Sequence, residues 1–231
     1  MNSDYIKTLI LQVYTDCSIR SFPIDCIEIL EHYKAKVYPY SVLDDPLRNY
    51  CFSYSEDALN YKGKVCFNDK MPKSRIRFSL MHELGHIILR HGEEPTPDQE
   101  KEADFFASHI LAPRMAIHYS RCKNENDVAK LFQLSQEAAR YAFDDYRRWH
   151  RWTEIHKMNL LDKAMYAHFY SKDRNCFVYS IKRCPYCDTL IYNSSDILCG
   201  RCKTPRVEHL RFQPPEEDLL IARSQWLYGG L

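Results

Sequence analysis

The sequence predicts an α+β fold, in which a mainly helical domain with a small β-sheet precedes a small C-terminal module. Apolar residues recur at helical spacing, three short segments between residues 36 and 68 have strand-like composition, and two Cys-x-x-Cys pairs stand near the C-terminus. With 231 residues, the chain exceeds one typical domain but falls short of two large ones. Hydrophobic residues make up 45% and no apolar run approaches membrane length, so we expect a globular protein without a membrane span.

The N-terminal region is expected to contain two packing helices followed by three strands. Apolar residues repeat at helical spacing over residues 5–14, and residues 21–33 suggest a second helix with Pro23 near its start. Turn-rich residues separate the strands, which should form a small sheet beside the next helix. The expected strands are residues 36–41, 50–54 and 64–68.

The most informative feature is the run HELGH at residues 82–86, which lies within an apolar stripe of helical period. His82 and His86 fall one turn apart on the same helical face, so both imidazoles can reach a single metal ion. Glu83 lies beside that face, where its carboxylate can take a proton from a water molecule without occupying a ligand position. Gly85 costs a helix about 1 kcal/mol relative to alanine, which suggests close backbone packing at this point. We therefore expect a hydrolytic zinc site rather than a chance match on an amphipathic helix.

A third ligand is expected from the following helix, because catalytic zinc usually keeps three protein ligands and one open position. The residues TPDQ at 96–99 have capping-box spacing, with proline at the first helical position. Glu100 then falls on the core-facing side and Glu102 on another face, so we expect Glu100 as the ligand and keep Glu102 as the alternative. Alternatively, both glutamates could act only by stabilising the N-terminus of the helix through its dipole. Asp104, one turn after Glu100, is expected to accept a hydrogen bond from a ligand imidazole.

The segments RIRF at 75–78, HELGH at 82–86, EKEADFFA at 100–107 and ILAP at 110–113 resemble the ImmA/IrrE family of bacterial and phage metallopeptidases. The resemblance spans residues 5–149, and residues 128–139 are similar to the family's helix-turn-helix-like tail. It implies a zincin-like metallopeptidase domain that inactivates helix-turn-helix transcriptional repressors and so switches on stress or mobile-element genes. That substrate class is implied by the resemblance alone.

A second metal site is expected near the C-terminus, where two Cys-x-x-Cys knuckles stand eleven residues apart. Four thiolates in this arrangement give the closed tetrahedral site that structural zinc prefers, so we expect a zinc ribbon without a catalytic role. The same ligands would also allow an iron site of rubredoxin type. A disulfide framework is disfavoured, because the other cysteines are scattered and the start of the chain does not read as a secretory signal. The expected ligands are Cys184, Cys187, Cys199 and Cys202.

We expect four consecutive units along the chain. Residues 1–150 would form the metallopeptidase domain and include a helix-turn-helix-like segment near 124–149. A helical connector at 151–180, the zinc ribbon at 181–212 and a C-terminal tail helix at 213–231 would follow. Acidic residues dilute the basic ones around the helix-turn-helix-like segment, and the formal net charge is +1. Packing or partner docking is therefore favoured over nucleic-acid binding, which is only weakly supported.

The leading expectation is a cytoplasmic zinc endopeptidase acting on a protein substrate, with one catalytic and one structural zinc ion. The alternative is a regulatory protein- or nucleic-acid-binding module with a vestigial metal site. In related zinc peptidases an edge strand holds the substrate as an added strand, and residues 64–68 are the candidate here, an ordinary core strand being the alternative. A donor that stabilises the oxyanion is also expected. The sequence offers no means of choosing it among His91, His118, Tyr119 and Tyr141.

Overall fold

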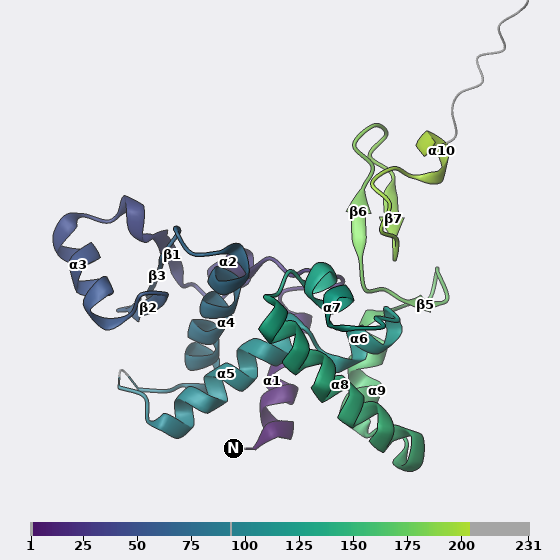
Figure 1. The fold of residues 1–231 in the computed structure, drawn as a ribbon, viewed down its shortest axis with the longest axis horizontal. Coiled ribbons are helices and arrows are strands. Elements are labelled where there is room, and N and C mark those ends of the chain that lie inside the picture. The colour runs from purple at the N-terminus through teal and green to yellow at the C-terminus, as the bar shows by residue number, and fades with distance from the viewer. Residues whose placement is uncertain (1, 93, 204–231) are drawn as a thin grey trace, which may run out of the picture.

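The computed structural model of the protein describes residues 2–92 and 94–203 (Figure 1). The expected tail helix at 213–231 and the last part of the expected ribbon lie outside the described residues. The helices are α1 (Ser3–Asp16), α2 (Cys26–His32), α3 (Asp45–Tyr54), α4 (Lys73–Leu89), α5 (Pro97–Leu111), α6 (Arg114–Tyr119), α7 (Glu125–Phe132), α8 (Gln136–His156), α9 (Leu160–Phe169) and α10 (Gly200–Lys203). The strands are β1 (Lys36–Pro39), β2 (Ala58–Tyr61), β3 (Lys64–Phe67), β4 (Tyr170–Ser171), β5 (Cys176–Phe177), β6 (Ile181–Arg183) and β7 (Leu190–Tyr192).

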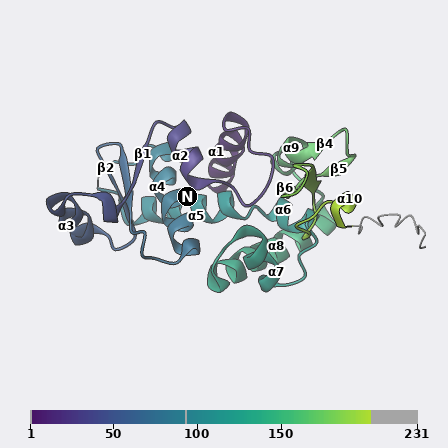
Figure 2. The ribbon, with the colours of Figure 1, turned by 90° about the horizontal axis from the view of Figure 1, so that it is seen from above.

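The described elements form an elongated α+β molecule with the packed helices α4 and α5 near its middle (Figures 1 and 2). One end carries α3 and a three-stranded sheet, and the other end carries α7, α8 and α9. The hairpin β6–β7 projects from this second end. None of the described helices is both long enough and apolar enough to cross a membrane.

The main hydrophobic core is built by helices whose apolar residues recur every three or four positions. In α1 the buried residues are Ile6, Ile10, Val13 and Tyr14, which confirms the helical spacing expected for the start of the chain. The Tyr14 hydroxyl donates a hydrogen bond of 2.7 Å to the carbonyl of Ile110 and so ties α1 to α5. Burial of each large apolar side chain contributes about 1.5–3 kcal/mol, so this core holds α5 firmly beside α4.

The small sheet has the strand order β1-β3-β2, with β3 in the centre. β1 runs parallel to β3, and β2 runs antiparallel to it with Ala58 opposite Phe67. The expectation that residues 64–68 form an edge strand is therefore wrong. Val65 and Cys66 point to opposite faces of the sheet and are both fully buried, as a central strand requires. Among the described strands, none pairs with the outer edge of β2.

The expected strand at residues 50–54 is also wrong, because these residues form the second half of α3. Their alternating aromatic residues look strand-like, but Pro46 in the first turn of the segment favours a helix start. Leu47 and Cys51 lie four residues apart and pack together into the small core around Tyr40. Tertiary packing of this helical face overrides the strand propensity of the aromatic residues.

The second expected helix begins later than residue 21. Asp25 accepts hydrogen bonds from the backbone N–H groups of Ile27 and Glu28, so α2 starts at Cys26 and Pro23 precedes it. A side-chain cap of this kind stabilises a helix start by about 1 kcal/mol, which fixes the boundary here. The start of α5, by contrast, has the expected capping box, with the Thr96 side chain accepting from the N–H of Gln99.

The second half of the chain contains the expected helix pair, α7 and α8, joined by a short turn. α8 runs through the expected domain boundary at residue 150, and the connector residues 151–180 hold its end, α9 and the hairpin β4–β5. Asp162 of α9 is buried and accepts hydrogen bonds of 2.9 Å from Arg114 and from the Trp149 indole. These bonds tie α9 to α6 and α8.

Candidate metal centre and its cleft

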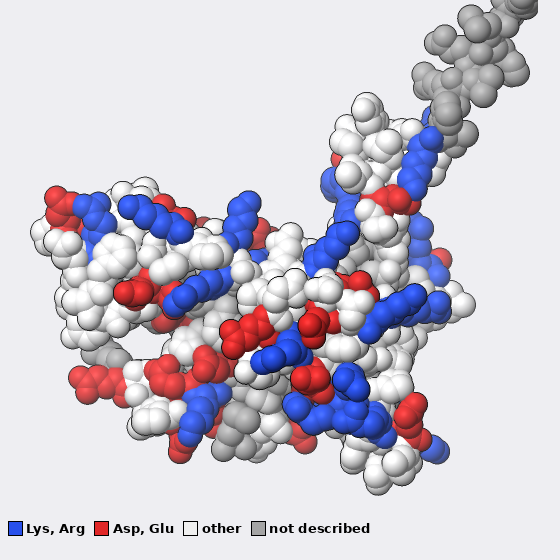
Figure 3. Space-filling view, in the orientation of Figure 1, with Lys and Arg blue, Asp and Glu red and all other residues white. Residues whose placement is uncertain are grey.

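A cleft of about 700 Å³ opens between β2, α3, α4 and α5. It contains the whole HELGH run except its two apolar positions, together with residues from the edge strand and from the start of α5. Acidic side chains gather over α5 in the space-filling view (Figure 3). The residues that line the cleft include Tyr50, Tyr54, Asn60, Tyr61, His82, Glu83, His86, His91, Glu100 and Asp104.

Three potential ligand atoms converge in this cleft. The Nε2 atoms of His82 and His86 lie 2.9 Å apart. Glu100 places Oε2 at 3.2 Å from Nε2 of His82 and Oε1 at 3.7 Å from Nε2 of His86. The alternative residue, Glu102, instead approaches Nε2 of His91 at 3.5 Å. The structure thus brings Glu100, and not Glu102, to the histidine pair.

Close packing of α4 on α5 makes this convergence possible. A Cβ atom at Gly85 would lie only 3.2 Å from Cα of Ala103 and 3.3 Å from both the Ala103 carbonyl oxygen and Cβ of Phe106. Ala103 and Phe106 are fully buried. The absence of a side chain at Gly85 therefore lets the backbone of α5 approach α4, as the sequence suggests for this position.

Each histidine of the pair has a partner on its outer nitrogen. Nδ1 of His82 lies 2.9 Å from Oδ1 of Asp104, which is the contact expected for that carboxylate. Nδ1 of His86 lies 2.9 Å from Nδ1 of His91, whose side chain is only 4% exposed. A hydrogen bond on Nδ1 fixes the imidazole ring and leaves Nε2 free to bind a metal ion.

His91, one of the four candidate oxyanion donors, contacts His86 instead. Its Nδ1 atom is directed at His86, on the side away from the convergent Nε2 atoms. The other three candidates, His118, Tyr119 and Tyr141, are not among the residues that line the cleft. No residue of that set is placed to stabilise an oxyanion.

Burial and neighbouring charges shift the pKa values of the cleft residues. Burial raises the pKa of Glu83 to about 7, although the adjacent His82 and a hydrogen bond from the backbone N–H of Asn60 act in the opposite direction. Burial, together with His82 and His91, lowers the pKa of His86 to about 4. Burial also lowers the pKa of His82, but its hydrogen bond to Asp104 and the nearby carboxylates outweigh burial and raise this pKa overall. At neutral pH, Glu83 can therefore exchange a proton while His86 stays neutral.

The donor set fits a zinc ion. Two imidazole nitrogens and a carboxylate oxygen are ligand types that catalytic zinc accepts, and the ligand atoms all lie within 4.8 Å of one another. A tetrahedral zinc ion about 2.0–2.1 Å from each nitrogen would hold them roughly 3.3 Å apart. The observed separation of 2.9 Å needs only a small outward movement to reach that value.

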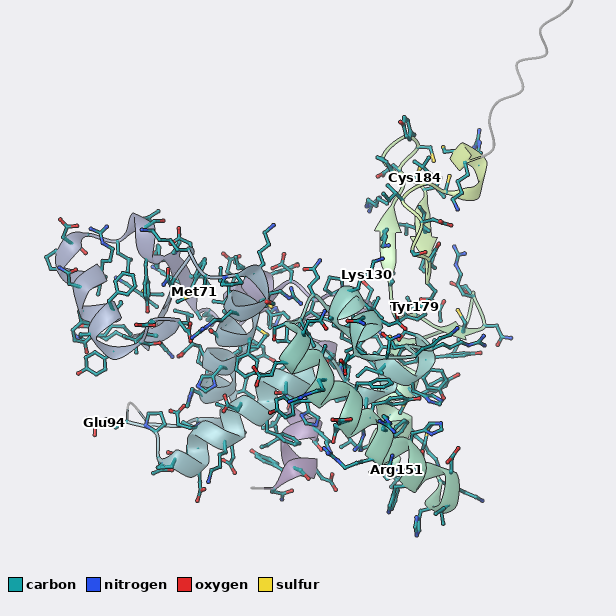
Figure 4. The ribbon with its side chains drawn as sticks, viewed as in Figure 1. Met71, Glu94, Lys130, Arg151, Tyr179 and Cys184 are labelled. Atoms are coloured by element: carbon teal, nitrogen blue, oxygen red, sulfur yellow. The ribbon has the colours of Figure 1, made fainter. Side chains whose placement is uncertain are left out.

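A second convergent group lies in the C-terminal module, far from the cleft in Figure 4, where Cys184 marks the outer part of the hairpin and Tyr179 its base. The Sγ atoms of Cys187 and Cys199 lie 3.4 Å apart, and all ten cysteines of the chain are free thiols. This arrangement is compatible with a zinc ribbon. The four sulfur atoms that lie within 4.8 Å of one another belong to Cys184, Cys187, Cys199 and Cys202.

The side-chain amide of Asn193 links this module to the connector. Oδ1 of Asn193 accepts hydrogen bonds from the backbone N–H groups of Tyr179 and Ser180, at 2.8 and 3.3 Å. Its Nδ2 atom donates to the carbonyl of Phe177 at 2.7 Å. The base of the hairpin is thereby fixed to the end of the connector.

A helix with an HExxH run, a glutamate from a second helix beside it and a small sheet along the cleft together indicate a metallopeptidase. The model of the peptidase family M78, described as the IrrE N-terminal-like domain, matches residues 31–144, about half of the chain. Through this segment the chain belongs to the ImmA/IrrE family of metallopeptidases. The matched residues include the whole convergent group in the cleft and exclude the cysteine module. No curated protein matches the chain.

Proposed function

We propose that the chain is a zinc-dependent endopeptidase in which His82, His86 and Glu100 hold the ion and Glu83 is the general base. The observation that carries this proposal is the convergence of Nε2 of both histidines and the Glu100 carboxylate within one cleft that also contains Glu83. Asp104 and His91 would orient the two imidazoles through their Nδ1 atoms.

A zinc ion held there would polarise the substrate carbonyl and lower the pKa of a nearby water molecule. Glu83 would accept the proton of the attacking water and later deliver it to the leaving amine. In the metal-free site burial raises the pKa of Glu83 to about 7, and a group that titrates near the working pH exchanges protons most effectively. The N–H group of Asn60 approaches Glu83 from the side of the sheet and lowers the pKa of its carboxyl group.

β2 is the strand best placed to receive an extended substrate, in place of the central strand β3 that the sequence favours. The backbone N–H of Asn60 is near enough to Glu83 to lower the pKa of its carboxyl group, so β2 lies beside the general base, and no described strand pairs with its outer edge. A peptide that pairs with this edge would bring its backbone past the ligand group. Main-chain pairing of this kind provides affinity with little dependence on sequence.

The substrate proposed is a helix-turn-helix transcriptional repressor, whose cleavage would derepress stress or mobile-element genes in the cytoplasm. Its support is the family of the matched segment, since no feature of the cleft identifies a particular protein. The four thiolates of the C-terminal module would hold a second, structural zinc ion.

The decisive experiment compares Glu83→Gln with Glu137→Gln, an exposed glutamate on α8 that does not line the cleft. Zinc content and cleavage of a pool of quenched fluorescent peptides would be measured for both. Glu83→Gln should keep its zinc and lose about 10²–10⁴-fold in rate, the usual contribution of a general base, whereas Glu137→Gln should behave as wild type. Unchanged cleavage in Glu83→Gln would contradict the proposal. A regulatory effect that survives this substitution in cells would favour a binding module with a vestigial metal site.

A further inference from the structure

A cluster of three tyrosines lines the cleft at the end away from α5. We name Tyr50, Tyr54 and Tyr61 the tyrosine cluster. The ring centroids of Tyr50 and Tyr54 lie 4.8 Å apart, and those of Tyr50 and Tyr61 lie 5.1 Å apart. Tyr50 thus contacts both other rings, and all three side chains line the same cleft as the candidate metal centre.

The tyrosine cluster is not needed to close the core beneath it. Tyr50 is 39% exposed and Tyr54 is 68% exposed. The small core under α3 is filled instead by Leu47 and Cys51, with Cys51 fully buried. Aromatic rings that are held in place and left exposed in a cleft provide a large apolar contact area at low entropic cost.

The position of the cluster relative to β2 shows which part of a bound peptide would reach it. Side chains alternate between the faces of a strand, and Leu59 packs against the small core below α3. Tyr61, two residues later on the same face, contacts Tyr50. A strand added to the free edge of β2 would alternate in the same way, so every second side chain would be directed to the face that carries the cluster.

The charges near the cluster favour an apolar side chain over a basic one. Asp57 lines this end of the cleft, but its carboxylate is already paired with Arg75 through bonds of 2.6 and 2.9 Å. The ammonium group of Lys62 lies 5.1 Å from the ring centre of Tyr61 and would repel a second cation.

We propose that the tyrosine cluster is a specificity subsite that accepts one large apolar or aromatic side chain of an extended substrate paired with β2. This inference rests on the proposed peptidase function. It defines the substrate class as segments that carry such a residue at one fixed distance from the cleaved bond. Residues with small or basic side chains at that position would be cleaved less efficiently.

The test uses the full-length, zinc-loaded protein and quenched fluorescent peptides that differ at one position at a time. The wild-type protein should prefer Phe or Leu over Ser at one position by roughly 10- to 100-fold in kcat/KM, the range that a single apolar pocket provides. Tyr54→Ala should remove most of this preference, mainly through KM, whereas Tyr54→Phe should retain it. Tyr54→Glu should move the preference towards Lys or Arg at the same position, a gain that misfolding cannot produce.

The matched control is Tyr5→Ala, because Tyr5 is 56% exposed on α1 and does not line the cleft. It should keep the wild-type preference, and zinc content should be the same in all variants. A preference that is unchanged in both Tyr50→Ala and Tyr54→Ala, with cleavage intact, would overturn the subsite but leave the peptidase function standing. A zinc-loaded wild-type protein that cleaves no peptide would overturn the peptidase function and the subsite with it.

Discussion

Replacing Gly85 with alanine tests whether the close approach of α4 and α5 builds the metal centre. On helix propensity alone, Gly85→Ala should stabilise the protein by about 1 kcal/mol. The new Cβ, however, would stand 3.2 Å from Cα of Ala103 and 3.3 Å from its carbonyl oxygen. Both are backbone atoms, so relief requires the whole of α5 to move by a few tenths of an ångström.

Overpacking of this kind costs about 1–3 kcal/mol, which exceeds or cancels the gain in propensity. We therefore expect Gly85→Ala to be less stable than the wild type by up to about 2 kcal/mol. Because α5 also carries Glu100 and Asp104, its displacement should weaken zinc binding, on the order of tenfold.

Urea unfolding of the metal-free protein, followed by far-ultraviolet circular dichroism, would measure stability, and competition with a fluorescent chelator would measure zinc affinity. Gly92→Ala is the matched control, because a Cβ at Gly92 would meet no atom within 4 Å. A Gly85→Ala protein that is about 1 kcal/mol more stable than wild type, with unchanged zinc affinity, would refute the reasoning.

Three further substitutions probe the cleft and the cysteine module. The folded-state pKa of Glu83 is about 7 against an ordinary 4.5, so the folded protein binds a proton that the unfolded chain releases in this window. Metal-free wild type should therefore lose up to about 3 kcal/mol relative to Glu83→Gln as pH rises from 4.5 to 7, and parallel pH–stability curves would contradict this. His91→Ala should reduce zinc affinity about 10- to 100-fold, while His32→Ala, on the exposed face of α2, should not change it when both are titrated with zinc. Cys187→Ser should lower the zinc content by one ion per chain in mass spectrometry and leave peptide cleavage measurable, because the cleft contains no residue of that module.

Local signals in the sequence predicted the parts of the site that depend on a single helix. The spacing of His82 and His86 and the capping box at Thr96 are set by helical geometry within a few residues, and the structure contains both. The choice of Glu100 over Glu102 also followed from helical phase, because the two residues face different sides of α5.

Features that depend on distant parts of the chain were not predictable in this way. The position of β3 in the centre of the sheet results from its pairing with both β1 and β2, which no local pattern encodes. The helical state of Tyr50 and Tyr54 depends on the core that α3 covers. His91 reaches His86 because the chain turns back at Arg90, which adopts a left-handed conformation with φ of 58°. A non-glycine residue in this conformation gives no readable signal in the sequence.

The length of β2 sets a limit on what the cleft can hold. The strand has four residues, so it offers an edge of roughly 13 Å. A paired peptide could form main-chain hydrogen bonds with it over about four residues. A helix cannot occupy such an edge, since its own backbone groups are already engaged. A segment of a folded protein that binds β2 as proposed would therefore have to unfold locally first, and the free energy of that local opening would be subtracted from the affinity. The turnover of a folded target would consequently report on the stability of the cleaved segment as much as on the peptidase itself.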